Sequence, residues 1–274
     1  MIKKIVQRIS AALVVLILAA YACFWIFPVP GQIPVLMYHF VGTEQDAVME
    51  KNYVSQQGLG RQMELLKKFG FHVISMKEYE AIRKGVEKPR GREVVITFDD
   101  GHKTFETLAV PVLKEYNYPV ILFLISDWLR RGPDETGSMT VETVKKLKAQ
   151  YSWISLGSHT RTHPVLPELK DAQIEEEVLG AKRELEAAFG IPMDYFAYPT
   201  GNYDERTLKV VEEAGYKLAF TTAPKKLKGA AEGDFNLTRI KMSRDSENPV
   251  IFWFKLSGLY QFFKIQRTKI LDSR

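Results

Sequence analysis

The longest apolar stretch of the chain lies near the N-terminus. Residues 9–27 include no charged side chain, and most of them are apolar. At about 1.5 Å per residue, a helix of this length nearly spans a bilayer core of about 30 Å. The stretch follows the basic residues Lys3, Lys4 and Arg8. Because such flanks stay in the cytoplasm, we predict a transmembrane signal anchor over residues 1–27, a linker over 28–33 and an extracytoplasmic chain beyond it.

The same stretch contains a candidate signal-peptidase site at Ala20-Tyr21-Ala22. The apolar run continues past this site from residue 23 to 27 and ends in aromatic residues of the kind found at membrane interfaces. This continuation favours an uncleaved anchor in the cell membrane. A cleaved signal peptide, which would release the protein, is the alternative.

Beyond the linker, apolar runs of strand length alternate with segments of helical periodicity. The strand-like runs cover residues 33–39, 72–75, 94–98, 120–125, 153–158, 195–198 and 217–222. The helix-like segments lie around 59–66, between Ser75 and Gly85, and over 104–116, 140–151, 171–189 and 204–214. Ser75 and Glu78 have the spacing of a capping box, and Pro111 predicts a kink or break. Gly190 follows the longest helix-like segment.

This alternation is typical of an α/β fold with a parallel sheet. Seven strands in just over two hundred residues predict a deformed (β/α) barrel of about seven strands over residues 34–245. Polar motifs follow the ends of four of the predicted strands, as expected at the carboxyl-terminal face of a barrel. An open doubly wound sheet would also gather polar residues at its strand ends and is the alternative fold.

The composition narrows the possible classes of protein. The apolar content of 46% and the charged content of 26% are those of a globular domain. The net charge is +5, but the basic residues are dispersed and form no stripe interleaved with aromatic residues, so we expect no nucleic-acid partner. The single cysteine, Cys23, lies in the predicted anchor, which excludes both a disulfide framework and a thiolate zinc site. We expect a monomer.

The C-terminal residues 246–274 combine aromatic and basic side chains. Two interpretations of this tail are equally compatible with the sequence. One is an amphipathic helix that lies on the membrane. The other is a last helix that packs against the barrel.

Two pairs of polar residues carry candidate chemistry. Asp99 and Asp100 end the strand-like run 94–98, and His159 and His163 follow the run 153–158. The spacing of the two histidines allows both to ligate one ion, and Asp100 would add an oxygen ligand. Two histidines and one carboxylate leave coordination positions open, which is typical of a catalytic site. The alternatives are a solvated turn and ordinary surface histidines.

These motifs resemble those of the polysaccharide deacetylases with a NodB homology domain, carbohydrate esterase family 4. The resemblance rests on Thr97-Phe98-Asp99-Asp100 and His159-Thr160-Arg161-Thr162-His163, and it covers residues 35–243. It implies a hydrolase that acts on linear amides and holds a divalent ion, most often zinc, with cobalt or nickel as alternatives. It also implies that Asp99 is the general base and that Asp100, His159 and His163 are the metal ligands.

Other site residues are implied by the same resemblance. The stretch from Phe196 to Gly201 matches a wall of the substrate groove, so we expect Tyr198, Pro199 and Thr200 to contact substrate and the Thr200 N–H to bind the oxyanion. Ala197 replaces the family's arginine that orients the base. The family's C-terminal Leu–His motif is missing.

The sequence Leu36-Met37-Tyr38-His39 instead stands at the start of the domain. It resembles the circularly permuted subgroup that includes poly-N-acetylglucosamine deacetylases, in which the orienting arginine is commonly absent. This implies that His39 is the general acid. We expect Leu36 or Met37 to line a pocket for the acetyl methyl, with core packing as the alternative. We also expect Arg161 and Arg239 to pair with acidic groups near the site.

Together these observations predict a membrane-anchored, extracytoplasmic enzyme. It would remove N-acetyl groups from a cell-wall or exported polysaccharide that contains N-acetylglucosamine, by means of a metal-activated water. The alternatives are an O-acetyl esterase of the xylan type and a non-catalytic glycan-binding domain on the same fold.

Overall fold

The computed structural model describes residues 14–15, 33–43, 53–222, 233–258 and 260. Nearly all of the predicted anchor, most of the linker and the tail beyond residue 260 therefore lie outside the described residues. Within the described part of the chain, no helix combines the length and the apolar character that crossing a bilayer requires. The membrane anchor stays a prediction.

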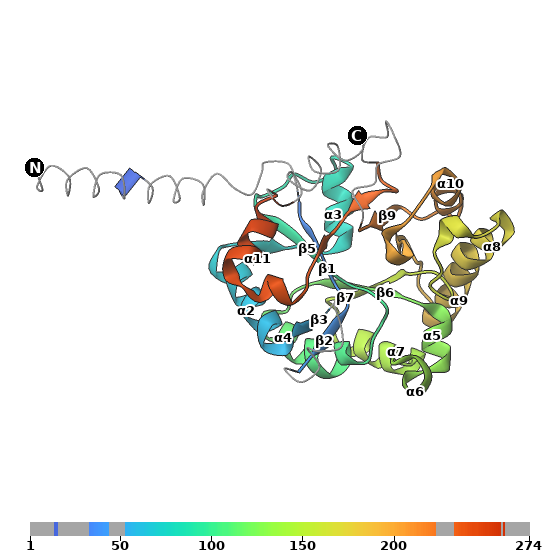
Figure 1. Ribbon diagram of the computed structural model, residues 1–274, viewed down its shortest axis with the longest axis horizontal. Helices are drawn as coiled ribbons and strands as arrows, with labels where there is room; N and C mark the ends of the chain where they lie inside the picture. The colour runs from blue at the N-terminus through green and yellow to red at the C-terminus, as the bar shows by residue number, and fades with distance from the viewer. Residues whose placement is uncertain (1–13, 16–32, 44–52, 223–232, 259, 261–274) are drawn as a thin grey trace, which may run out of the picture.

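A ring of parallel strands forms the centre of the molecule (Figure 1). In chain order the strands are β1 (Val35–Tyr38), β5 (Glu93–Phe98), β6 (Val120–Leu124), β7 (Ile154–Ser158), β8 (Tyr195–Ala197), β9 (Leu218–Thr221), β10 (Leu237–Thr238) and β11 (Ile240–Lys241). Each pairs with its neighbours in parallel, and β10 and β11 lie at the two ends of the hydrogen-bonded path. From β1 to β9, helical crossovers connect successive strands of the ring, as parallel pairing requires.

Arg239 alone separates β10 from β11. Since β10 pairs with β9 and β11 pairs with β1, this bent segment joins the two ends of the sheet and closes the barrel. Counted as one strand, it makes seven strands in the ring. The predicted deformed barrel is confirmed, and an open doubly wound sheet is excluded.

Several short elements differ from the prediction. The run 72–75 forms β4 (His72–Val73), which pairs with the start of β5 and lies off the ring. The segment 237–241 supplies the seventh strand in its place. This strand was missed because it consists of two-residue pieces interrupted by a charged side chain. A separate pair, β2 (Phe40–Gly42) and β3 (Tyr53–Ser55), was also not predicted.

Helices surround the ring (Figure 1). They are α2 (Gln56–Lys68), α3 (Met76–Arg83), α4 (Val110–Tyr116), α5 (Ser126–Arg131), α6 (Pro133–Thr136), α7 (Val141–Gln150), α8 (Asp171–Glu175), α9 (Ala181–Phe189), α10 (Glu205–Glu213) and α11 (Pro249–Leu256). Single π turns precede α4 and α9, namely η2 (Phe105–Ala109) and η4 (Glu176–Gly180). The 3-10 turns among the described residues are η3 (Leu166–Glu168), η5 (Pro199–Gly201) and η6 (Arg244–Glu247).

The capping and terminating signals in the sequence act as predicted. Ser75 and Glu78 form the capping box of α3, and Gly190 ends α9 in the left-handed conformation with a φ of 67°. Pro111 lies at the start of α4, directly after the π turn η2. Because proline has no N–H to donate, the regular hydrogen-bond ladder changes there from the π to the α pattern. The backbone stays helical across the junction, so the predicted break does not occur, and a kink at Pro111 stays a prediction.

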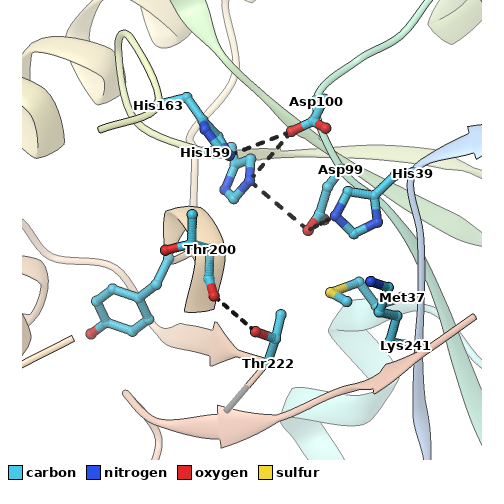
Figure 2. A pocket seen from close by; sticks show the side chains of 10 residues that line it. Met37, His39, Asp99, Asp100, His159, His163, Thr200, Thr222 and Lys241 are labelled. Atoms are coloured by element: carbon cyan, nitrogen blue, oxygen red, sulfur yellow. Dashed lines mark hydrogen bonds and ion pairs between the residues drawn. The ribbon is translucent and has the colours of Figure 1, made fainter. Parts of the chain in front are cut away.

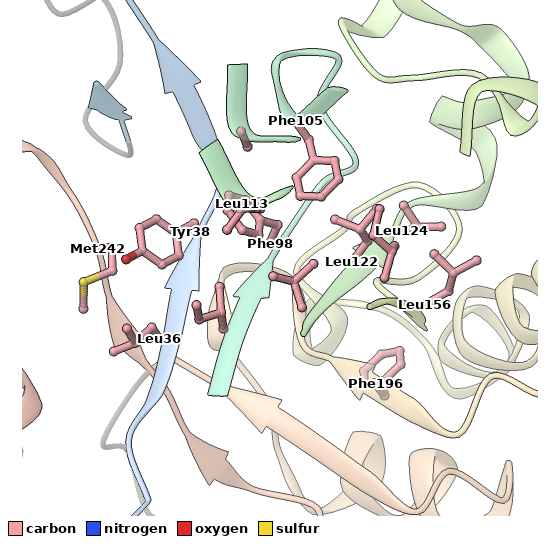
Figure 3. Packing of buried hydrophobic residues seen from close by; sticks show 14 of the residues in the cluster. Leu36, Tyr38, Phe98, Phe105, Leu113, Leu122, Leu124, Leu156, Phe196 and Met242 are labelled. Carbon is pink, nitrogen blue, oxygen red and sulfur yellow. The ribbon is translucent and has the colours of Figure 1, made fainter. Parts of the chain in front are cut away.

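Alternation along the strands sorts side chains into two layers. In β5, Ile96 and Phe98 belong to the larger core between the ring and the helices, whereas Val95 belongs to the core inside the ring. Figure 3 shows the outer layer. The inner layer also includes Ile74, Met76 and Tyr79 from α3 and the connection that precedes it. Its other members are Val35, Val95, Ile121, Phe123, Tyr195, Ala197, Leu218, Phe220 and Leu237.

Gly157 of β7 makes room for one of these inner side chains. A Cβ at this position would lie 2.7 Å from the ring of Phe123. The absence of a side chain therefore allows the ring to fill the middle of the barrel, which leaves the carboxyl-terminal end for polar groups.

The first part of the C-terminal tail packs on the barrel. Phe252 and Leu256 of α11 are buried in the larger core, and Trp253 contacts the rings of Phe69 and Phe71 edge-on. For residues 249–256 the structure therefore supports a packed helix and not a helix that lies on a membrane. Residues 261–274 lie outside the described part, so the second interpretation stays open for them.

Candidate active site

A cavity of about 200 Å³ opens at the carboxyl-terminal end of the ring. It is lined by Met37, His39, Asp99, Asp100, His159, His163, Tyr198, Thr200, Thr222 and Lys241 (Figure 2). These residues come from segments at the ends of β1, β5, β7, β8, β9 and β11. The predicted convergence of separate motifs at one face is therefore confirmed. The volume lies below the 300–1,000 Å³ typical of pockets for drug-sized ligands.

Asp99 and Asp100 are adjacent in sequence, yet both line the cavity. Alternation would send neighbouring side chains of a strand to opposite faces. Asp100 instead has a positive φ of 66°, so the chain turns immediately after the strand. Asp99 is buried, with an exposed side-chain fraction of 2%, whereas that of Asp100 is 26%.

The two histidines lie on a turn after β7. Thr160 and His163 both have positive φ values, 65° and 66°. This turn brings the two imidazoles to a centroid separation of 4.9 Å. Nε2 of His159 lies 3.5 Å from Oδ1 of Asp100, and Nε2 of His163 lies 3.7 Å from the same oxygen. One ligand atom from each of the three side chains fits within 4.8 Å of the others, as a single ion requires.

The protonation of His159 follows from its partners. Its Nδ1 lies 2.7 Å from the carbonyl oxygen of Ala197, which can only accept a hydrogen bond, so Nδ1 carries the proton. Burial lowers the pKa of His159 to about 3, and the attraction of Asp99 offsets this only in part, so the ring is neutral at pH 7. Its Nε2 then presents a lone pair to Asp100. Nε2 of His159 and Oδ1 of Asp100 are then both acceptors and cannot bond to each other, so the pair is suited to hold a cation between them.

Asp99 is held by an arginine from the segment that closes the barrel. Arg239 donates from its two terminal nitrogens to the two carboxylate oxygens, each at 2.6 Å, and also to Oγ1 of Thr97 at 3.1 Å. Its guanidinium carbon lies 5.2 Å from the centre of the Phe123 ring. Burial alone would raise the pKa of Asp99, but Arg239 first, and then His159 and His39, hold it at about 2.

The expected pairing of Arg239 with an acidic group is thus confirmed. The signal for it in the sequence is weak, because Arg239 lies between the two-residue strands Leu237–Thr238 and Ile240–Lys241. Arg161 also pairs with acidic groups, Glu176 and Glu184, but on the exposed side of the loop and not in the cavity.

His39 lies beside the buried carboxylate. Its Nε2 is 3.9 Å from Oδ2 of Asp99, and the two side chains face each other in Figure 2. Burial lowers the pKa of His39 to about 4; the carboxylate of Asp99 opposes the shift, while Arg239 and Lys241 add to it. The imidazole of His39 is therefore neutral at pH 7 and can accept a proton.

The predicted substrate contacts divide into two groups. Thr200 and Tyr198 line the cavity, although the Tyr198 ring is buried and its hydroxyl donates to the carbonyl of Phe235. Pro199 is buried in the turn η5 and is not among the residues that line the cavity. Thr200 has a positive φ of 57°, and its carbonyl accepts a hydrogen bond from Oγ1 of Thr222 at 3.1 Å.

The expectation that Leu36 lines the cavity is wrong. Leu36 is fully buried in the outer core, and the adjacent Met37 lines the cavity instead. The reason is alternation along β1, which points residues 35, 37 and 39 into the ring and sends Leu36 toward the helices. Since His39 was already placed in the site, counting back by two would have selected Met37.

Lys241 and Thr222 also line the cavity and were not predicted. Lys241 pairs in register with Met37 across β11 and β1, so its side chain points the same way. Thr222 directly follows β9. Neither residue belongs to a recognisable motif, and only the ring closure identifies Lys241, whereas Thr222 lies at the end of a predicted strand.

Comparison with known proteins agrees with this geometry. A family model described as polysaccharide deacetylase matches residues 86–219. A Bacillus subtilis (strain 168) protein named "Putative polysaccharide deacetylase YxkH" is 31% identical over 217 residues, which cover 78% of this chain and 72% of that protein. The poly-beta-1,6-N-acetyl-D-glucosamine N-deacetylase of Staphylococcus aureus (strain MSSA476) is 28% identical over 207 residues, 72% of this chain and 70% of that protein.

Solved structures share the architecture. The Streptococcus pyogenes deacetylase PplD in complex with acetate superposes with a TM-score of 0.72 at 26% identity, covering 81% of this chain and 98% of that one. IcaB from Ammonifex degensii gives a TM-score of 0.69 at 24% identity, with 81% and 97% covered. The second likeness concerns the fold alone.

Proposed function

The chain belongs to the polysaccharide deacetylase family, and from this premise we propose that it removes N-acetyl groups from a polysaccharide containing N-acetylglucosamine, with a divalent metal ion. Its class, a deacetylase acting on polysaccharide, follows from the 31% identical relative, of which the match covers 72%. The substrate within that class is proposed by analogy with the staphylococcal relative, whose name specifies poly-beta-1,6-N-acetyl-D-glucosamine.

One observation carries the metal dependence. Asp100, His159 and His163 turn three acceptor atoms toward one point, and the hydrogen bond to Ala197 fixes the His159 ring with its lone pair inward. The donor set of two imidazoles and one carboxylate fits zinc, and cobalt or nickel are alternatives. A divalent ion held there would lower the pKa of water and polarise the acetyl carbonyl.

Asp99 fits the role of general base. The pKa of about 2 means that its carboxylate is ionised at neutral pH, and the two bonds from Arg239 fix the plane of the carboxylate toward the cavity. Asp99 takes a proton from the attacking water, while the water oxygen bonds to the acetyl carbon. We assign Arg239 as the residue that positions this base.

His39 fits the role of general acid. The neutral ring lies 3.9 Å from Asp99, close enough to exchange a proton with the carboxylate after a small movement. When the bond between the carbonyl carbon and nitrogen breaks, the imidazole delivers the proton to the departing nitrogen. Acetate and a free amino sugar result, so the proton removed from water is returned to the product.

The opposite wall supplies groups that bind substrate. The hydrogen bond from Oγ1 of Thr222 to the carbonyl of Thr200 holds the backbone of Thr200 at the rim of the cavity. We propose that the N–H of Thr200 stabilises the oxyanion. Met37 replaces Leu36 as the apolar contact proposed for the acetyl methyl.

The location is a separate proposal. The charge-free stretch 9–27 and its basic flank support a membrane-anchored enzyme whose barrel faces the outside of the cell and acts on wall or exported glycan. Carbonate extraction of membranes tests the anchor, and protease treatment of intact spheroplasts tests the side. Release of the chain by carbonate, or protection of the barrel from protease, would contradict the proposal.

Acetate release tests the reaction. The protein is stripped with a chelator, resupplied with zinc, cobalt or nickel, and offered oligomers of β-1,6-linked N-acetylglucosamine, chitin oligomers and O-acetylated xylan. We expect metal-restored release from an N-acetylated glycan. Release from the xylan alone would favour the O-acetyl esterase, and binding without release would favour the non-catalytic alternative.

A further inference from the structure

The turn that carries the two histidines is a strained segment. It runs from His159 to His163 and is called here the histidine turn. Two of its residues, Thr160 and His163, adopt left-handed backbone conformations without being glycine. Such conformations persist only where the surroundings hold the backbone in place. Groups from two neighbouring elements hold this turn.

The carbonyls of the turn are held by the start of α5. The N–H of Ser126 donates to the carbonyl of Thr160 at 3.3 Å, and the N–H of Asp127 donates to that of Arg161 at 3.0 Å. Helix N-termini have N–H groups without partners inside the helix, so α5 can supply these donors at no cost to its own ladder.

The amides of the turn are held by a single carboxylate. Oε2 of Glu177 accepts the N–H of Arg161 at 2.9 Å and that of Thr162 at 2.8 Å, and Oε1 accepts the hydroxyl of Thr162 at 2.6 Å. Hydrogen bonds to an ionised carboxylate are about twice as strong as neutral ones. One side chain thus fixes two consecutive peptide groups between the metal-ligand positions.

Glu177 reaches the turn because of the π turn η4. This wide turn spans residues 176–180 between α8 and α9 and presents two successive glutamates to the histidine turn. Glu177 contacts the backbone, while Glu176 pairs with the side chain of Arg161 at 3.4 Å. Val178 in the same turn is fully buried, which anchors the π turn to the core.

We infer that Glu177 positions the metal ligands, through the backbone of the histidine turn and without touching the ion. The N–H of His163 itself donates to Oγ1 of Thr160 at 3.1 Å, within the turn. Because His163 follows the two amides that Glu177 holds, fixing those amides helps to keep its imidazole beside Asp100. Glu177 therefore organises the site before a metal arrives. The inference rests on the metal centre of the proposed function.

The test compares Glu177→Ala with Glu175→Ala in the full-length chain. Glu175 is an exposed carboxylate on the preceding turn of the same helical segment, so its removal controls for lost charge and helix content. Zinc affinity is measured on chelator-stripped protein by competition with a chromophoric chelator. Hydrogen exchange of the peptide covering residues 159–163 is measured without metal.

We expect Glu177→Ala to weaken zinc binding by about 10- to 100-fold, the usual effect of losing a group that orients a ligand, and to accelerate exchange in the histidine turn. Glu175→Ala should stay within about twofold of the native affinity. Glu177→Gln retains one acceptor oxygen and should give an intermediate affinity. A purely structural role would lower the stability of the metal-free protein and leave the affinity unchanged.

The inference would be overturned if Glu177→Ala bound zinc as tightly as Glu175→Ala, or if hydrogen exchange in the histidine turn did not change. Either result would leave the metal centre itself intact. A native protein that binds no divalent ion would overturn the metal centre as well. If Glu177→Ala does not fold, Thr162→Val removes one of the three bonds and should weaken zinc binding relative to Thr162→Ser, which keeps the hydroxyl. Equal affinities of these two variants would also count against the inference.

Discussion

The two halves of the candidate active site satisfy their charges in opposite ways. The base side, made of Asp99, Arg239 and His39, pairs its buried carboxylate inside the protein. The metal side, made of Asp100, His159 and His163, directs acceptors at one another. The base side thus pairs its charge within the polypeptide, whereas the metal side would be complemented by the proposed cation. Asp99 and Asp100 are adjacent in sequence, yet one carboxylate lies against an arginine and the other lies against two histidines.

The two sides also differ in how the chain builds them. The base side joins β1, β5 and the segment between β10 and β11, which are distant in sequence. Both histidines of the metal side belong to one turn held by its immediate surroundings, and only Asp100 comes from elsewhere. Substitutions on the base side should therefore lower the stability of the barrel, and substitutions on the metal side should weaken ion binding.

Asp99→Asn should give the largest effect and separate the two sides. Loss of a general base lowers kcat by about 10²- to 10⁴-fold, but the zinc content should remain that of the native protein because Asp99 is not a proposed ligand. Acetate release and metal analysis measure the two quantities. Asp100→Asn is the matched control and should lose zinc. Full activity of Asp99→Asn, or loss of zinc from it, would contradict the separate roles of the base side and the metal side.

Arg239→Met should destabilise the barrel itself. It leaves the buried Asp99 carboxylate without its partner, and breaking a buried ion pair in this way costs about 3–5 kcal/mol of unfolding free energy. Urea unfolding measures this change. The double variant with Asp99→Asn should regain part of the loss, since no charge is then buried alone. Additive effects of the two substitutions would show that the pair is not coupled.

His39→Gln should change how stability depends on pH in the metal-free protein. The pKa of His39 falls from 6.5 unfolded to about 4 folded, so the unfolded state binds more protons between these values. Native stability is therefore lost as the pH falls through this window, by about 2 kcal/mol from this group at pH 5. Unfolding at pH 7 and pH 5 should show a shallower loss in His39→Gln. The same slope in both proteins would contradict the shifted pKa.

Thr200→Gly should have the smallest effect. Glycine adopts the positive φ of 57° without strain and keeps the backbone N–H proposed to bind the oxyanion. We expect a change in unfolding free energy of less than about 1 kcal/mol and activity within a few fold of native. Acetate release measures the activity. A loss as large as that of Asp99→Asn would mean that the Thr200 side chain, and not its peptide, acts in the reaction.

The sequence predicted the metal side better than the base side, and the reason is physical. His159 and His163 are four positions apart, and Asp100 adjoins a strand end, so spacing and strand position are enough to bring them together. The partner of Asp99 lies 140 residues away in sequence, in a strand that has almost no β pattern of its own. Only closure of the ring brings Arg239 and Lys241 to the cavity.

The fold shows the same contrast. Strands with continuous apolar runs, such as β5 and β6, were predicted to within two residues, because burial on both faces demands such runs. The π turns were not predicted, since one extra residue in a helical turn leaves no mark in an amphipathic pattern. One of them, η4, carries the glutamate inferred to hold the histidine turn.

The segment around Arg239 also has a consequence for the order in which the protein is made. A ribosome releases His39, Asp99 and both histidines before residues 237–241 emerge. Until then the ring lacks a strand and the Asp99 carboxylate lacks its counter-charge, so burial of Asp99 is unfavourable. The same short segment then contributes the missing strand pairing and the neutralising guanidinium together. Nascent chains that end before residue 239 should therefore stay open, protease-sensitive and inactive, although they already contain every proposed metal ligand.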